Sequence, residues 1–243
     1  MKALLVNPSS PESYWSGVRS LRFAGRRCLL PPLGLLTVAS LLPPRWRLDL
    51  ADENVAEIRD ERLRAADVAM LTGMLVQRDS LQKLLARCRA LGVRTVVGGP
   101  YATTFPEDLA AADHVAVGEG EEFVPRLAAD LEAGTAARVY RAEGWPDLAG
   151  LPPPRFDLLP KRVYRQMAIQ FSRGCPFDCE FCDVVRLYGR RPRTKSPRQF
   201  VGELEALRAT GFRGDVFVVD DNFVGDRAAA RAALAEVARW RRG

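Results

Sequence analysis

The chain has 243 residues, of which 47% are hydrophobic and 27% are charged, and its formal net charge is +6. This ordinary globular composition excludes a disordered or fibrous chain and predicts one or two domains with enough apolar residues for a core. The positive charge lies mostly on arginines, but no basic stretch is interleaved with aromatic residues, so we expect no nucleic-acid partner.

The hydropathy pattern shows no targeting or membrane-spanning segment. The first apolar run, residues 1–6, ends at Asn7 and is too short for the apolar core of a signal peptide. The most apolar stretch, residues 29–42, is broken by prolines and a glycine and is shorter than the ~20 residues of a membrane span. The pattern indicates a cytoplasmic protein, for which peripheral membrane contact stays open.

Up to about residue 135, short apolar runs alternate with helical patterns. The apolar runs predict strands at residues 3–6, 47–50, 67–72, 94–97 and 114–117. The helical patterns occupy residues 32–42, 80–91 and a segment that ends near residue 131. Strands separated by helices indicate βαβ units, so we expect an α/β fold with a parallel sheet of the flavodoxin-like kind.

Small and polar residues follow four of these strands at their carboxyl ends. They are Asn7-Pro8, Thr72-Gly73-Met74, Gly98-Gly99-Pro100 and Gly118-Glu119-Gly120. Ligands of open parallel sheets bind outside this edge, where glycine permits close approach of a flat or extended ligand. Ordinary turns between strand and helix explain these residues equally well. No G-x-G-x-x-G follows the first strand and no phosphate-binding P-loop exists, which argues against dinucleotides and nucleoside triphosphates.

The pattern weakens between residues 135 and 165. Prolines and glycines there predict a linker with one short strand at residues 138–140. We place the domain boundary near Gly150, which divides the chain into domains 1–150 and 151–243.

Two strand–helix units are expected after the boundary. The first has a strand at residues 167–171 and a helix that begins after Ser196 and ends at Gly211. Ser196 is the expected N-cap, Pro197 is the first helical residue, and Gln199 completes a capping box. The expected inner face of this helix is Phe200, Leu204 and Leu207.

The second unit has a continuous apolar strand at residues 215–219, typical of a parallel barrel, and a helix at residues 227–241 capped by Asp226. The expected inner face of that helix is Leu234, Val237 and Ala238. A solvated loop is the simplest interpretation of the basic residues between the units, Arg186, Arg190, Arg191, Arg193 and Lys195. Two units cannot close a barrel, so we expect a truncated partial barrel with exposed apolar edges, as a fragment or completed by a partner.

Three cysteines form a C-x3-C-x2-C pattern, Cys175, Cys179 and Cys182. Thiolates on one short loop can hold three irons of a [4Fe–4S] cluster and leave the fourth iron open for a ligand. Zinc is a weaker alternative, because structural zinc takes four ligands and the only histidine, His114, lies in the other domain. A disulfide would leave one odd cysteine and suits secreted proteins, and three buried free thiols so close together would be unusual.

This cysteine pattern, with the aromatic Phe181 before the last cysteine, resembles the radical S-adenosylmethionine (SAM) superfamily. A longer match covers residues 170–182, 189–195 and 216–223 and resembles the cobalamin-binding branch, nearest to enzymes like the hopanoid C-2 methylase. The resemblance covers nearly the whole of this chain and about half of a full enzyme of that kind.

The resemblance implies three cofactors, a [4Fe–4S] cluster, SAM and cobalamin. In that family the three cysteines bind the cluster, its open iron chelates SAM, and electron transfer cleaves SAM to a 5′-deoxyadenosyl radical. It further implies that Phe181 lines the adenine site through its backbone and that Asp220, Asp221 and Asn222 help to bind SAM. A capping or turn role is expected for one of the two aspartates. An electron donor such as flavodoxin or ferredoxin is the implied partner.

The first domain resembles the cobalamin-binding domain of the same branch. The cobalamin contacts that this implies are Asn7, Pro8, Gly34, Thr72, Gly73, Met74, Gln77, Gly98, Gly99, Pro100, Gly118, Glu119 and Gly120. The D-x-H-x-x-G motif that supplies a lower cobalt ligand in the wider cobalamin family is absent. His114 begins an expected strand and is interpreted as a packing residue. We therefore expect no histidine below cobalt and assign residues 74–78 to the lower face.

The function implied is that of a cobalamin-dependent radical SAM methyltransferase, or part of one, that transfers methyl to an unactivated carbon of a small or lipid-like substrate. Two alternatives stay open. One is another reaction of the same branch, such as rearrangement or cyclisation. The other is a non-catalytic module that binds cobalamin, a cluster or a partner. No residue of this chain identifies the substrate.

Overall fold

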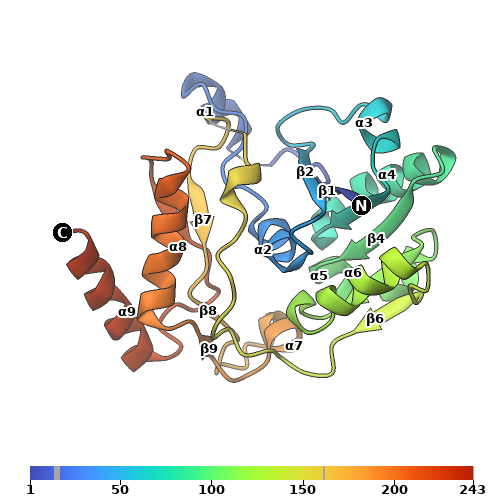
Figure 1. The fold of residues 1–243 in the computed structure, drawn as a ribbon. Coiled ribbons are helices and arrows are strands. Elements are labelled where there is room, and N and C mark those ends of the chain that lie inside the picture. The colour runs from blue at the N-terminus through green and yellow to red at the C-terminus, as the bar shows by residue number, and fades with distance from the viewer. Residues whose placement is uncertain (14–16, 161, 243) are drawn as a thin grey trace.

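The computed structural model describes residues 1–13, 17–160 and 162–242. Its largest element is a six-stranded sheet with the order β2-β1-β3-β4-β5-β6, in which every neighbouring pair is parallel (Figure 1). The strands are β1 (Lys2–Asn7), β2 (Arg47–Asp52), β3 (Val68–Thr72), β4 (Arg94–Gly98), β5 (His114–Val117) and β6 (Val139–Arg141). The predicted α/β fold with a parallel sheet is therefore confirmed.

Helices cover both faces of this sheet. On one face lie α2 (Leu33–Leu41) and α6 (Val124–Ala133), and on the other α3 (Asp60–Arg64), α4 (Arg78–Ala90) and α5 (Pro100–Thr104). In β1, Ala3 and Leu5 belong to the first hydrophobic cluster and Leu4 and Val6 to the second. Because side chains alternate along a strand, a strand covered on both faces needs an unbroken apolar run, which is the pattern seen in the sequence.

The region after the linker holds two small sheets. β7 (Met167–Ile169) pairs in parallel with β10 (Val216–Val218), and β8 (Ser172–Arg173) pairs antiparallel with β9 (Arg193–Thr194). Its helices are α7 (Val184–Tyr188), α8 (Pro197–Ala209) and α9 (Arg227–Trp240). Shorter elements elsewhere are α1 (Val18–Phe23), η2 (Leu75–Gln77), η3 (Pro106–Leu109), η4 (Gly120–Glu122) and η5 (Phe156–Leu158). The two expected strand–helix units are thus β7 with α8 and β10 with α9.

The two regions share one hydrophobic core. The cluster on the α2 side of the large sheet continues to Met167 and Phe171 near β7 and to Phe200 of α8. In Figure 1, α2 lies between the large sheet and β7. The Tyr164 hydroxyl, just before β7, donates a hydrogen bond to Asp52 at the end of β2 (3.0 Å). The cluster on the α4 side, by contrast, contains residues of the first region alone.

The capping box predicted for α8 is only half formed. Ser196 accepts a hydrogen bond from the Gln199 amide (3.1 Å), as expected of an N-cap. The Gln199 side chain donates instead to the carbonyl oxygens of Leu148 (2.8 Å) and Leu151 (3.2 Å). The Gln199 side chain therefore binds the linker and does not complete the capping box. These hydrogen bonds hold the linker against the start of α8.

Helix α9 buries a different face from the predicted one. Asp226 caps it as expected, by accepting a hydrogen bond from the Ala229 amide (3.0 Å). Its buried residues are Ala230 and Ala233. Leu234 is 55% exposed and Ala238 is exposed, so their assignment to the inner face is wrong, whereas the half-buried Val237 packs against the core. The helix packs against α8, and the small alanine side chains allow the two helices to approach closely.

The basic residues before α8 are not all solvated. Arg193 has a side chain that is only 13% exposed, and it forms an ion pair with Glu119 (2.5 Å). Lys195 is buried and forms an ion pair with Glu203 of α8. The interpretation as a solvated loop is therefore wrong for Arg193 and Lys195.

The second region leaves apolar side chains uncovered, as expected for a partial barrel. Phe217, in the centre of β10, is 49% exposed. Val224, which follows the strand, is 59% exposed. Across the described residues, no helix combines the length and the apolar character that a membrane crossing requires.

Candidate cofactor site

The carboxyl ends of β1, β3, β4 and β5 meet at one edge of the large sheet, because these strands are parallel neighbours. The loops that follow them, called here the carboxyl-edge loops, are residues 7–8, 72–78, 98–100 and 118–121. They contain every predicted cobalamin contact except Gly34, which lies exposed in the first turn of α2. The strand order reverses between β1 and β3, and ligands of such sheets bind at this reversal.

Two side chains tie the carboxyl-edge loops to one another. Gln77 is buried and donates a hydrogen bond to the Pro8 carbonyl oxygen (2.6 Å), which joins the β3 loop to the β1 loop. Thr103 of α5 donates to the Gly99 carbonyl oxygen (2.9 Å) and accepts from the Gly118 amide (3.0 Å). The four loops thus form one connected rim along the sheet.

The rim combines a strained turn with exposed apolar surface. Gly99 has a φ of +91°, and a Cβ on it would lie 2.3 Å from Thr72 Oγ1, so the turn itself requires glycine. Beside it, the adjacent side chains of Met74, Leu75 and Val76 are 59%, 57% and 62% exposed. Contiguous exposed apolar side chains of this kind mark a surface that can bind a ligand.

The three cysteines of the predicted cluster site lie in residues 174–183, a segment without regular secondary structure, called here the cysteine loop. All three are free thiols, half-buried at Cys175 and Cys182 and exposed at Cys179. Nowhere in the described ranges do three Cys, His, Asp or Glu side chains converge closely enough to hold a metal ion. The donor chemistry fits an iron–sulfur cluster, since three unpaired thiols stand on one short loop.

The start of the cysteine loop is held tightly. Gly174 has a φ of +88°, and a Cβ on it would lie 2.6 Å from the Arg191 carbonyl oxygen. The Cys175 amide donates a hydrogen bond to the Gly189 carbonyl oxygen (3.1 Å). Glycine at position 174 therefore lets the chain pass against the segment between α7 and β9, which fixes the position of Cys175.

Asp220, at the end of β10, holds the backbone ahead of the cysteine loop. Its carboxylate accepts hydrogen bonds from the amides of Phe171 (2.7 Å) and Ser172 (2.8 Å) and from the Ser172 hydroxyl (2.5 Å). Burial raises the pKa of Asp220, although these hydrogen bonds oppose the change. The turn role expected for one of the two aspartates is taken by Asp220. Nearby, the Asn222 side-chain amide donates to Cys175 Sγ (3.4 Å).

The two other predicted SAM contacts are open to solvent. Asp221 is exposed at the end of β10. Desolvation of its carboxyl group raises its pKa, and the nearby carboxylates of Asp220 and Asp183 raise it further. The Phe181 side chain is 94% exposed. Both residues are therefore accessible to a ligand on the cysteine loop.

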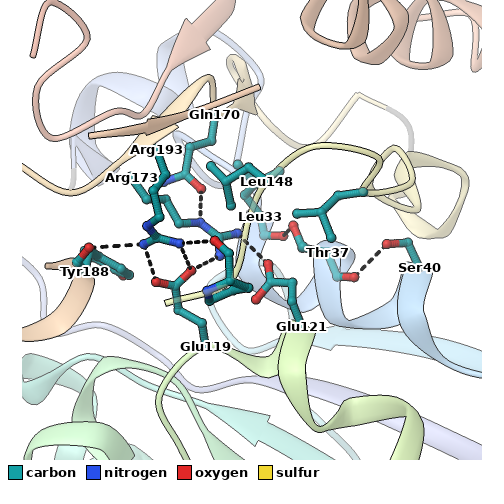
Figure 2. Close-up of polar contacts among 12 residues, drawn as sticks. Leu33, Thr37, Ser40, Glu119, Glu121, Leu148, Gln170, Arg173, Tyr188 and Arg193 are labelled. Carbon is teal, nitrogen blue, oxygen red and sulfur yellow. Dashed lines mark hydrogen bonds and ion pairs between the residues drawn. The ribbon is translucent and has the colours of Figure 1, made fainter. Parts of the chain in front are cut away.

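Glu119 connects the carboxyl-edge loops to the cysteine loop. Its buried carboxylate forms ion pairs with Arg173 and Arg193 (both 2.5 Å), and Glu121 pairs with Arg173 (2.7 Å) (Figure 2). Sequence reasoning missed Arg173 and Glu121 as site residues. The only available signals were the Gly-Glu-Gly-Glu run at residues 118–121 and an arginine two residues before the first loop cysteine, and their long separation in the sequence hides the pairing.

The remaining cysteines and the histidine are poorly placed to act as ligands. Burial raises the pKa of the Cys28 and Cys88 thiols to about 11, so both stay protonated near neutral pH, where a metal ligand must be a thiolate. His114 begins β5, and its Nδ1 donates a hydrogen bond to the Ala137 carbonyl oxygen (2.6 Å). It lies at the end of the strand opposite to the carboxyl edge, in line with a packing role.

Comparison with known proteins gives this arrangement a family context. Residues 24–128 match the model of the B12 binding domain. An uncharacterized methyltransferase from Synechocystis sp. is 44% identical over 99% of this chain, and the hopanoid C-2 methylase of Rhodopseudomonas palustris is 34% identical over 88%. The anaerobic magnesium-protoporphyrin IX monomethyl ester cyclase of Synechocystis sp. is 28% identical over 86%. The chain covers 45%, 41% and 47% of these relatives, or about half of their length.

Solved structures share the fold at low sequence identity. The radical SAM methyltransferase TsrM from Kitasatospora setae, with cobalamin and a [4Fe–4S] cluster bound, matches with a TM-score of 0.70 and 18% identity. That match covers 99% of this chain and 51% of TsrM. The cobalamin-dependent SAM radical enzyme OxsB matches with a TM-score of 0.70 and 14% identity, over 97% of this chain and 36% of its own.

A parallel α/β domain followed by strand–helix units is therefore a fold that this chain shares with solved structures over nearly its whole length. It defines a two-part class of α/β protein. The chain carries a B12 binding domain and is related to the cobalamin-binding radical SAM methyltransferases, so the resemblance drawn from its cysteine pattern is confirmed.

Proposed function

We propose that this chain forms the cobalamin- and cluster-binding part of a radical SAM methyltransferase, which transfers methyl to an unactivated carbon of a small or lipid-like substrate. The observation that carries the proposal is the junction between the rim of the sheet and the cysteine loop. Buried ion pairs from Glu119 to Arg173 and Arg193 join the two. Ligands bound on the two sides of this junction would face each other across one interface.

The carboxyl-edge loops are the proposed cobalamin site. The exposed apolar side chains of residues 74–76 suit the flat face of a corrin ring, because ligand sites are lined mainly by apolar groups. Gln77 supports this loop from inside through Pro8, while its neighbours meet the ligand. His114 lies at the opposite end of β5, which supports a cobalt site without histidine on its lower face.

The cysteine loop is the proposed site of the cluster and SAM. The proposed cluster ligands are Cys175, Cys179 and Cys182. Asn222 directs a hydrogen bond to Cys175, which is one means by which proteins tune the reduction potential of a cluster. Asp220 positions the preceding backbone, and Asp221, Asn222 and the backbone of Phe181 are the proposed SAM contacts. When bound, the cluster and SAM supply a 5′-deoxyadenosyl radical, and cobalamin supplies the methyl group.

The partners and the compartment follow from the same proposal. A low-potential electron donor such as flavodoxin or ferredoxin would reduce the cluster. A cluster with an open iron requires a reducing compartment, so we propose a cytoplasmic location. Peripheral membrane contact would suit a lipid-like substrate.

Anaerobic reconstitution of the full chain tests the proposal. With iron, sulfide and hydroxocobalamin, we expect about four irons and four sulfides per chain, as in a [4Fe–4S] cluster, together with bound cobalamin. Replacing the three loop cysteines by alanine should abolish iron uptake, whereas cobalamin should still bind. The matched control, Cys28→Ala with Cys88→Ala, should keep both. Uptake of zinc in place of iron would contradict the proposal. So would a reduced cluster whose electron paramagnetic resonance spectrum does not change when SAM is added.

Two further measurements separate the alternatives. Formation of 5′-deoxyadenosine after reduction distinguishes an enzyme from a non-catalytic module. The mass of the product distinguishes methylation, which adds a methyl group, from cyclisation. Cyclisation is the second candidate because one relative is named as an anaerobic cyclase.

A further inference from the structure

Four charged side chains meet where the two regions touch. Glu119 and Glu121 come from the β5 loop, Arg173 from β8 and Arg193 from β9 (Figure 2). Glu119 pairs with both arginines (2.5 Å each), and Glu121 pairs with Arg173 (2.7 Å). Arg173 is fixed further through its Nε, which donates to Gln170 Oε1 (2.8 Å). We call this cluster the junction network.

The junction network is buried and electrically balanced. The four side chains are between 4% and 13% exposed, and two carboxylates face two guanidinium groups. Burial alone would lower the pKa of Arg173, but the carboxylates of Glu121 and Glu119 more than offset this and raise it. A buried ion pair is costly to desolvate. The network is therefore better explained by the defined geometry that it imposes on the two regions than by a net gain in stability.

Each side of the network is continuous with a cofactor site. Glu119 stands between Gly118 and Gly120 in a carboxyl-edge loop, while Arg173 directly precedes Gly174 and Cys175. Gly174 is closely packed, since a Cβ on it would lie 2.6 Å from the Arg191 carbonyl oxygen. A displacement of the β5 loop would therefore act on Arg173, which stands beside this packed turn and two residues before Cys175.

From this geometry we infer that Glu119, Glu121, Arg173 and Arg193 are positioning residues that couple the cobalamin site to the cysteine loop. Occupancy of one site orders the other, and the network sets the separation between the two cofactors. The inference rests on the proposed function. Because coupling between binding sites is reciprocal, it is measurable from either side.

The experiment is a binding cycle on the full chain under anaerobic conditions. The dissociation constant of hydroxocobalamin is measured before and after reconstitution of the cluster. In the parent protein, the cluster should tighten cobalamin binding by about fivefold or more, the lower end of typical coupling. In Glu121→Gln, both cofactors should still bind, but the ratio of the two constants should fall towards one. Arg173→Lys keeps the charge and should retain part of the ratio.

The matched control is Glu132→Gln. Glu132 in α6 forms a glutamate–arginine pair with Arg45 near the surface, away from the junction. The ratio of the two dissociation constants in this variant should therefore equal that of the parent. Hydrogen exchange supplies a second readout. Hydroxocobalamin should slow exchange at the amides of residues 173–182 in the parent and in Glu132→Gln, and leave it unchanged in Glu121→Gln.

The outcomes separate this inference from the proposed function. If the parent binds both cofactors with a ratio of one, or if Glu121→Gln keeps the parental ratio and protection, the inference is wrong and the proposed function stands. If the parent binds no cobalamin or no cluster, the proposed function itself fails. Glu121→Gln is suited to this test because it removes a single ion pair, that with Arg173.

Discussion

The two regions of the molecule bury their residues differently. In the first region, the cluster on the α4 side is closed, and Leu63 and Leu85 in it have no exposed surface. In the second region, Phe217 and Leu234 are about half exposed, and the apolar core is shared with the α2 side of the large sheet. The first region thus has one apolar cluster of its own and one that it shares, whereas the second region contributes buried residues only to the shared cluster.

The regions also differ in where their charges lie. Ion pairs of the first region, such as Arg62 with Asp49, are open to solvent. The second region has exposed pairs as well, such as Arg165 with Asp215, but the pair of Lys195 with Glu203 and the network around Glu119 are buried. Exposed pairs contribute ~0–1 kcal/mol, but removing one partner of a buried pair costs ~3–5 kcal/mol. The second region should therefore be the more sensitive to the loss of a single charge.

The largest expected effect is that of Lys195→Met. This change leaves the Glu203 carboxylate buried without its partner, and one of its oxygens, Oε2, already lacks a hydrogen-bond partner. We expect a loss of ~3–5 kcal/mol in the free energy of unfolding near pH 7, measured by urea denaturation. The double variant Lys195→Met with Glu203→Leu should recover most of that loss, and no recovery would contradict the assignment.

The same variant has a defined pH dependence. Burial raises the pKa of Glu203, although Lys195 opposes this. A carboxyl group whose pKa is raised by folding favours the folded state below its unfolded pKa and disfavours it as the pH rises through the folded pKa. The deficit of Lys195→Met should therefore be largest above neutrality and shrink as the pH falls towards ~4.3, the ordinary pKa of glutamate.

The next effect compares a leucine from each region. Leu85→Ala opens a cavity in the closed cluster and should cost ~2–5 kcal/mol. Leu234→Ala, on the exposed face of α9, should change the free energy of unfolding by less than ~0.5 kcal/mol. Equal losses in the two variants, measured in parallel denaturation curves, would show that α9 is covered in solution.

A smaller effect is expected at the cap of α9. Asp226→Ala removes the hydrogen bond to the Ala229 amide and should cost ~1 kcal/mol, whereas Asp226→Asn should cost much less because asparagine is also a good N-cap. Amide exchange in the first turn of α9 should rise in the alanine variant alone. An unchanged exchange rate would show that the cap does not stabilise the helix.

The smallest effect concerns reactivity and leaves stability unchanged. In protein without a cluster, iodoacetamide should modify the exposed Cys179 first. Cys88 should react only after unfolding, because it is fully buried and burial holds its pKa near 11. Mass spectrometry of digested samples follows each thiol, and early modification of Cys88 would indicate that the first region opens.

Several features of this protein were predictable from local patterns. Unbroken apolar runs and turn residues located β1 to β5 within a few residues, since a strand buried on both faces requires such runs. The N-caps Ser196 and Asp226 were found because a cap is a local hydrogen bond. The three cysteines were recognised from their spacing on one loop.

Other features depend on contacts that no local pattern encodes. Leu234 carries a helical inner-face pattern, but the packing of α9 on α8 buries the alanines instead. Arg173 and Glu121 meet only because the β5 loop is folded against β8. The spacing of residues within one segment determined that three thiols share one loop. Tertiary packing decided which charges are buried together, because that depends on surfaces that are distant in the sequence.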